Sequence, residues 1–196
     1  MVRFIVLMLL LAIYPCSSTS GSDDTNNDYV RDVCSVTRYP DLCIHSLSSF
    51  SKTAGQSPSR WARASVSVTI GEAKKVALYL STLSRSNWAM RGRNKVALSD
   101  CIECFGDALD NLHKSLYVLR KLSVREFGSQ VDDVATWVSS ALTDEDTCVD
   151  GFIEGGKGKR VRSIVNRVSN VTYMTSNALA LIDKLATAGP RCLVDD

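Results

Sequence analysis

Residues 137–152 read WVSSALTDEDTCVDGF, and this stretch decides the fold because it carries Cys148 near the end of a predicted helix. A second cysteine, Cys101, lies in the sequence DCIE near the start of the preceding predicted helix. When consecutive helices are antiparallel, the start of one lies beside the end of the next, so the two sulfurs can meet. A Cys101–Cys148 bond would then hold two long helices in one register.

Outside this pair, four segments carry apolar residues at alternating spacings of three and four, which is typical of amphipathic helices. The predicted helices span residues 58–85, 94–127, 129–150 and 161–188, with Gly128 and Gly151 as their expected stops. The stripe predicted for the first of them is Trp61, Ala64, Val68, Val76, Leu80 and Leu83. Short loops make neighbouring helices antiparallel, so the sequence predicts an all-α, up-down-up-down four-helix bundle.

A small helical hairpin is predicted in front of the bundle. Residues 28–37 and 40–50 form two short helical segments around a turn at Tyr39-Pro40, because proline restricts the residue before it. Cys34 and Cys43 flank this turn and are expected to close the hairpin with a disulfide bond. Residues 51–58 are rich in serine and are predicted to be a linker, so the whole domain covers residues 28–192.

The first 22 residues have the layout of a secretory signal peptide. Arg3 precedes an unbroken apolar run at 4–13, which is too short to span a bilayer, and small and polar residues follow. A buried N-terminal helix and a lipid-modified Cys16 are the alternatives. We therefore expect a secreted, extracellular protein with no membrane association once the signal is removed. Its net charge of +2 includes Arg3, so no strong field favours nucleic acid or membranes.

Six cysteines follow the signal, and an even number suits disulfide bonding in an oxidising compartment. Cys104 and Cys192 remain after the two predicted pairs. An up-down bundle would place Cys192 at the pole opposite Cys104, so we expect both to be free, with a third bridge as the open alternative. Asn170-Val171-Thr172 is an acceptor sequence for N-glycosylation in a secreted chain.

The sequence offers little for catalysis, metal binding or a cofactor. Its two histidines, His45 and His113, lie in different elements, and no activated-serine motif occurs, so the chain is not expected to be an enzyme. Cys101-x-x-Cys104 has the spacing of zinc ligands, but no second pair completes a site. Both cysteines fall within one helix, which also disfavours a redox role. We predict neither metal nor cofactor.

Charged and glycine-rich stretches of the sequence are further candidates for binding sites. The sequence around Gly151, Gly156 and Lys157 partly matches a phosphate loop, but Gly158 stands where serine or threonine must hold magnesium, so we interpret it as a chance match. A basic cluster nearby is either a solvated loop or a contact for an anionic polysaccharide; its members are Lys157, Lys159, Arg160 and Arg162.

A further candidate for a binding site is acidic. Glu103, Asp107 and Asp110 are spaced by four and three residues, so they share one face of a helix. The run Asp144-Glu145-Asp146 lies near the end of the next helix, where negative charge gains nothing from the helix dipole. These residues are either solvated or part of a surface for a protein partner.

Three motifs together resemble the plant invertase and pectin methylesterase inhibitor family. They are CSVTRYPDLC at 34–43, DCIECFGDALDNL at 100–112 and WVSSALTDEDTCVDGF at 137–152, and their order and spacing agree throughout the mature chain. The same domain forms the N-terminal pro-region of some pectin methylesterases. No catalytic domain follows here, so the resemblance implies a stand-alone inhibitor. It also implies the same two disulfides, while Cys104 and Cys192 depart from the family's four-cysteine pattern.

The resemblance further implies a mode of action. Inhibitors of this family cap the cleft of pectin methylesterase in a one-to-one complex in the cell wall, largely through their second and third long helices. By motif, the partner-binding residues here are Glu103, Asp107, Asp110 and Thr147. Inhibition of acid invertase is the alternative, but residues 123–130 lack the Pro-Lys-Phe tripeptide of many invertase inhibitors. A helical carrier of a small apolar ligand is a further alternative, which the large residues of the stripes disfavour.

Overall fold

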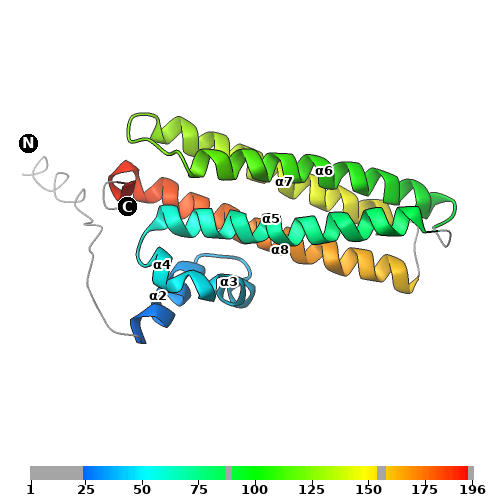
Figure 1. The fold of residues 1–196 in the computed structure, drawn as a ribbon, viewed down its shortest axis with the longest axis horizontal. Helices are drawn as coiled ribbons and strands as arrows, with labels where there is room; N and C mark the ends of the chain where they lie inside the picture. The colour runs from blue at the N-terminus through cyan, green and yellow to red at the C-terminus, as the bar shows by residue number, and fades with distance from the viewer. Residues whose placement is uncertain (1–23, 87–89, 154–157, 194–196) are drawn as a thin grey trace, which may run out of the picture.

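The computed structural model describes residues 24–86, 90–153 and 158–193 (Figure 1). The predicted signal at 1–22 lies outside these described residues, and so does Lys157 of the basic cluster. Every described element is helical, which confirms the all-α class. None of the described helices is long and apolar enough to cross a membrane.

Four long helices form the main body: α5 (Pro58–Arg85), α6 (Arg93–Leu119), α7 (Phe127–Ile153) and α8 (Lys159–Ala188). Consecutive helices run in opposite directions (Figure 1), and each packs against the next along the chain. Helix α8 also packs against α5 and so closes the ring. The predicted up-down-up-down bundle is confirmed.

Local sequence signals place several helix ends where they were expected. Pro58 occupies the first turn of α5, and the Ser57 hydroxyl accepts the backbone N–H of Arg60 at 3.2 Å. At the far end of the chain, Gly189 follows α8 with a φ of +76°, a conformation that favours glycine, and Pro190 prevents further helix.

Helix α5 differs from its prediction because it is buried on two sides. Its bundle side carries Ala62, Val66, Ile70, Ala73, Val76 and Leu80. Trp61, Ala64 and Val68 instead pack into a second apolar cluster with the N-terminal hairpin. The predicted stripe was therefore wrong in joining Trp61 and Ala64 to Val76 and Leu80, because a helix buried on two sides shows no single apolar face.

The boundary between α6 and α7 was also misplaced. Helix α6 ends at Leu119, eight residues before the predicted end, and α7 begins at Phe127. The Ser123 hydroxyl accepts the backbone N–H of Glu126 at 3.2 Å, and the Gln130 side chain accepts that of Ser123 at 2.8 Å. Ser123 to Glu126 has the spacing of a helix-capping box, a signal that starts a new helix and that the apolar periodicity concealed.

Neither Gly128 nor Gly151 ends a helix. Both lie within α7, which continues to Ile153, and neither has a positive φ. A Cβ atom at Gly151 would lie 3.6 Å from the Ala97 Cβ of α6, so the two helices pass close together there. The predicted linker at 51–58 is shorter than expected because it contains a single helical turn, α4 (Ser51–Ala54).

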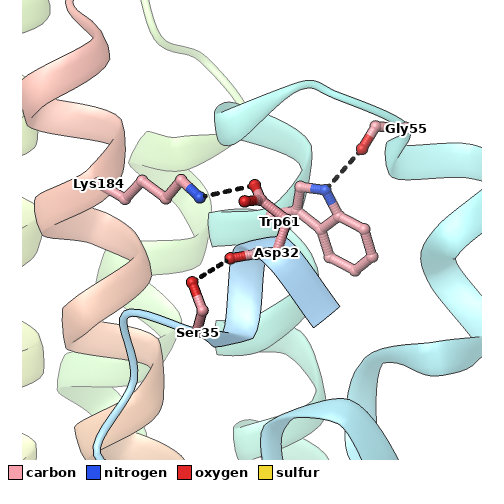
Figure 2. A network of polar contacts seen from close by, with 5 residues as sticks. All are labelled: Asp32, Ser35, Gly55, Trp61 and Lys184. Atoms are coloured by element: carbon pink, nitrogen blue, oxygen red, sulfur yellow. Dashed lines mark hydrogen bonds and ion pairs between the residues drawn. The ribbon is translucent and has the colours of Figure 1, made fainter. Parts of the chain in front are cut away.

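The N-terminal hairpin consists of α2 (Asp24–Cys34), α3 (Pro40–Leu47) and the short helix η1 (Ser48–Phe50). It packs against α5 and α8 at one side of the bundle (Figure 1). Figure 2 shows this junction: the Trp61 indole N–H donates to the Gly55 carbonyl at 2.8 Å, and Lys184 pairs with Asp32 at 3.2 Å. Trp61 is 2% exposed, so its burial stabilises the junction more than the solvated ion pair does.

A buried amide joins the hairpin turn to α8. The side chain of Asn177, which is 4% exposed, accepts the Tyr39 backbone N–H at 3.0 Å and donates to the Tyr39 carbonyl at 2.9 Å. Tyr39 also stacks on Tyr173, with ring centroids 4.2 Å apart. One side chain thus satisfies both backbone groups of the residue before Pro40.

Both predicted disulfides are confirmed. Cys34 is bonded to Cys43, and Cys101 is bonded to Cys148 with their Cα atoms 4.4 Å apart. Cys104 and Cys192 stay outside these bridges, as predicted. The Cys192 thiol is buried and lies 3.8 Å from the Ala188 carbonyl, which accepts its weak hydrogen bond.

Candidate functional site

The acidic row of the sequence lies on the outer side of α6. Glu103, Asp107 and Asp110 are all exposed, while Cys101 and Phe105 of the same helix point into the core. The one-turn spacing therefore places three carboxylates together on the side that faces away from the bundle axis. This agrees with their predicted position on a surface.

The seam between α6 and α7 extends this row onto a second helix. The Asn111 amide donates to the Ser140 hydroxyl at 3.2 Å across the seam. One turn away, partial burial raises the pKa of the Asp144 carboxyl, the charge of Asp107 raises it further, and the Asn111 amide opposes both effects. The seam thus brings two carboxylates from different helices within electrostatic reach, and one Asp144 oxygen is buried with no hydrogen-bond partner.

Thr147 completes this surface on α7. It is exposed and follows Asp144 by three residues, so both lie on the same side of α7. Its hydroxyl donates to the Thr143 carbonyl at 2.8 Å, within its own helix. Beside it in sequence, Cys148 carries the bond to α6, so the residues of this surface stand on two covalently joined helices. We call Glu103, Asp107, Asp110, Asp144 and Thr147 the α6–α7 face.

Cys104 also lies in this seam, which the sequence did not indicate. Burial raises the pKa of its thiol, and the negative charges of Asp144, Asp107 and Asp100 raise it further. The thiol therefore stays protonated and is a poor nucleophile at neutral pH. The other residues that sequence reasoning missed, Asn111 and Ser140, are neutral, and nothing in their spacing marked them out.

The Asp144-Glu145-Asp146 run does not form one acidic surface. Glu145 points inward and is 0% exposed, while Asp146 is exposed. The Thr175 hydroxyl of α8 donates to one Glu145 oxygen at 2.9 Å, and the other oxygen has no partner. Burial raises the pKa of Glu145 to about 8, which the Thr175 hydrogen bond only partly offsets, so the side chain is a neutral acid at physiological pH.

The remaining candidates from the sequence do not assemble a reactive centre in the described part of the chain. His45 and His113 are exposed on α3 and α6. No group of three His, Cys, Asp or Glu side chains is placed to hold a metal ion within the described residues. Cys101 is disulfide-bonded and so does not pair with Cys104 as a zinc ligand. Gly151 lies inside α7, so the stretch that begins there does not form a phosphate-binding loop.

The α6–α7 face therefore offers three exposed carboxylates on α6, beside Asp144 and Thr147 of the cross-linked helix α7. Comparison with known proteins then decides the family, because a model described as "Plant invertase/pectin methylesterase inhibitor" matches residues 28–181. The chain belongs to this inhibitor family. The motif resemblance seen in the sequence is confirmed.

Relatives within the family differ in their sequence identity to this chain. Pectinesterase inhibitor 6 of Arabidopsis thaliana is 46% identical over 180 residues, which cover 88% of this chain and 86% of that protein. Pectinesterase inhibitor 9 of the same plant is 32% identical, and the match covers 93% of each chain. A crystal structure of a mutant pectin methylesterase inhibitor from Arabidopsis has the same fold, with a TM-score of 0.63 over 77% of this chain and 93% of that chain, at 22% identity.

Proposed function

We propose that this protein inhibits pectin methylesterase by binding non-covalently over the cleft of the enzyme in a one-to-one complex. Its relatives are named pectinesterase inhibitors, and one of them is 46% identical over most of the chain. The observation that supports this binding mode is the α6–α7 face, where three exposed carboxylates of α6 lie beside the half-buried Asp144 and the exposed Thr147 of the disulfide-bonded helix α7. The protein would act in the cell wall after secretion.

The physical properties of the face suit a protein partner. Helices α6 and α7 are each 27 residues long, or about 40 Å at 1.5 Å per residue. Two such helices offer enough surface for a standard interface, which buries ~800 Å² per partner. Because the Cys101–Cys148 bond holds their register before binding, little order has to be created on association. No covalent step is required.

A direct assay tests this function. We expect the purified protein to inhibit a plant pectin methylesterase, scored by methanol release, and to leave acid invertase active, scored by glucose release. The absence of Pro-Lys-Phe in residues 123–130 and the names of the relatives favour this outcome. Inhibition of invertase without inhibition of the esterase would reject the proposal in favour of the sister activity.

A charge reversal tests the proposed binding residues. Asp107→Lys places a cation in the middle of the α6–α7 face, so we expect the inhibition constant to rise by about tenfold, equivalent to about 1.4 kcal/mol. Asp183→Lys makes the same change at an exposed position of α8 and serves as the matched control, with no expected effect on the inhibition constant. Thermal unfolding of both variants should match the parent protein. Equal inhibition constants for the two variants would remove Asp107 from the interface.

A further inference from the structure

The bundle carries opposite charges on opposite sides. Helix α7 has six acidic residues and no lysine or arginine, and α6 has four acidic and three basic residues. By contrast, α5 and α8 each have five basic residues and one acidic residue. Helices α5 and α8 pack against each other, as do α6 and α7, so the ring of four helices places the basic pair opposite the acidic pair. The small net charge of +2 conceals this division.

A hollow of about 680 Å³ lies on the basic side, between α5 and α8. Three exposed cations line it, Lys159, Arg162 and Arg167, together with the amides of Asn166 and Asn170. These five residues lie between positions 159 and 170 of α8, over about 16 Å of helix. Cations and neutral hydrogen-bonding groups therefore line the hollow together.

Contacts between the two helices hold the wall of this hollow in place. The Tyr79 hydroxyl of α5 donates to the Ser163 hydroxyl of α8 at 3.1 Å. The Arg167 guanidinium lies over the Tyr79 ring, 4.6 Å from its centroid. Arg167 is thus positioned in advance of any ligand, with its planar face on the ring and its N–H groups available at the edge.

One acidic residue also lines the hollow, and it forms an ion pair within its own helix. Glu72 pairs with Lys75 one turn along α5 at 2.9 Å. The net charge of the lining, with its three cations, therefore remains positive. Glu72 itself can accept hydrogen bonds from hydroxyl groups, which an anionic carbohydrate provides and an inorganic anion does not.

We propose that this hollow binds a run of carboxylate-bearing sugar units in a pectin chain whose methyl esters have been removed. Arginine recognises carboxylates through paired N–H donors, and the two asparagines suit the neutral hydroxyls between them. The hollow is lined by polar residues that extend over about 16 Å of α8, which fits a segment of an extended polymer. The choice of polymer rests on the proposed function, since de-esterified pectin is the anionic product that pectin methylesterase leaves.

The position of the hollow has a consequence for the inhibitor. Because the α5–α8 side lies opposite the α6–α7 face, the chain can bind the polymer and the enzyme at the same time. An inhibitor held on de-esterified pectin would accumulate where the enzyme has already acted. Asn170, the predicted glycosylation site, lines the same hollow, so a glycan there would compete with the polymer.

Binding of defined oligosaccharides tests the proposal without any esterase, so its outcome is independent of the inhibition assay. The full chain carrying no glycan at Asn170 is titrated calorimetrically with a ten-unit galacturonate oligomer and with its fully methyl-esterified form. We expect binding of the first, no binding of the second, and at least a tenfold weakening in Arg162→Gln/Arg167→Gln. Failure to bind the galacturonate oligomer would overturn the proposal.

A matched double variant distinguishes binding in this hollow from a general effect of positive charge on the protein. Arg120→Gln/Arg125→Gln removes two exposed arginines beyond the end of α6, away from the hollow, and should bind like the parent protein. Equal weakening in both double variants would overturn the assignment, provided that thermal unfolding shows both to be folded. Binding of dextran sulfate as tight as that of the galacturonate oligomer would also overturn it, because a carboxylate site should prefer the carboxylate polymer.

Discussion

Glu145 is the residue whose environment differs most from its sequence context. It lies between two aspartates in an acidic run, yet its carboxyl group is buried in the bundle and accepts a hydrogen bond from Thr175. A charged carboxylate there would lack water and one hydrogen-bond partner, so the protonated form is favoured and the pKa rises to about 8. The folded protein thus holds a proton that the unfolded chain releases near pH 4.5.

This difference predicts how stability depends on pH. Between about pH 4.5 and 8 the folded state keeps the Glu145 proton and the unfolded state does not, so the free energy of unfolding falls as pH rises, by up to about 1.4 kcal/mol per pH unit. Glu145→Gln keeps an acceptor for Thr175 and should flatten the fall in urea denaturation measured across this range. Glu103→Gln on the exposed side of α6 is the control and should leave the slope unchanged. Parallel curves for all three proteins would contradict a buried, protonated Glu145.

At the scale of elements, two disulfides constrain loops of different length. The Cys101–Cys148 bond spans 47 residues and the Cys34–Cys43 bond spans 9. A cross-link lowers the entropy of the unfolded chain more when the loop is longer. The loss of chain entropy therefore predicts a stabilisation of ~4 kcal/mol for the first bond and ~2.5 kcal/mol for the second. The bond between α6 and α7 is therefore expected to contribute more to stability.

Double alanine variants test which of the two disulfides contributes more to stability. Cys101→Ala/Cys148→Ala should lose more unfolding free energy than Cys34→Ala/Cys43→Ala, each determined by urea denaturation without reductant. The former should also inhibit less well, since α6 and α7 together carry the α6–α7 face. A larger loss from the hairpin pair would show that the hairpin, and not the long-helix register, limits stability.

The hairpin is joined to α8 by Asn177, which predicts a local effect. Asn177→Ala removes both hydrogen bonds to Tyr39. The Tyr39 carbonyl keeps the Cys43 backbone N–H at 3.0 Å, but the Tyr39 N–H loses its acceptor, so we expect a loss of about 2 kcal/mol. Proteolysis should then cut first near residues 35–39. Asn166→Ala, at an exposed amide of the same helix, is the control and should unfold like the parent protein. Unchanged stability in Asn177→Ala would show that the Cys34–Cys43 bond and Tyr173 stacking hold the turn without these hydrogen bonds.

At the scale of the whole molecule, charge separation matters more than net charge. The acidic α6–α7 side and the basic α5–α8 side give the bundle two distinct electrostatic surfaces. Such surfaces steer encounters with charged partners and are screened by salt. The two proposed activities, inhibition and polymer binding, would then use opposite sides and opposite charges.

Salt should weaken inhibition if the acidic face meets the enzyme. We expect the inhibition constant to rise by about three- to tenfold between 0.02 and 0.5 M NaCl, because screening shortens the reach of the carboxylates. Asp107→Asn should reduce this dependence, and Asp183→Asn on α8 should not. A constant that does not change with salt would show that the complex is held by uncharged contacts.

Residue spacing predicts some features of this fold and not others. The bundle, the hairpin, both disulfides and the exposed row Glu103, Asp107 and Asp110 follow from spacing, because a helix repeats every 3.6 residues whatever surrounds it. Predictions from residue spacing were wrong where two structural features overlapped in the same stretch of sequence. The apolar repeat ran through the Ser123–Glu126 cap, and the two buried sides of α5 merged into one stripe.

The sequence alone therefore determined the helices, their order and their cross-links, since these depend on neighbours along the chain and on cysteine chemistry. Only the tertiary structure decided which acid of the Asp144-Glu145-Asp146 run is buried, that Asn177 holds Tyr39, and that cations of α8 share a hollow with α5. The reason is physical: burial and contact depend on the rotation of each helix against its neighbours. That rotation is set by packing across the whole bundle, and no local pattern of residues records it.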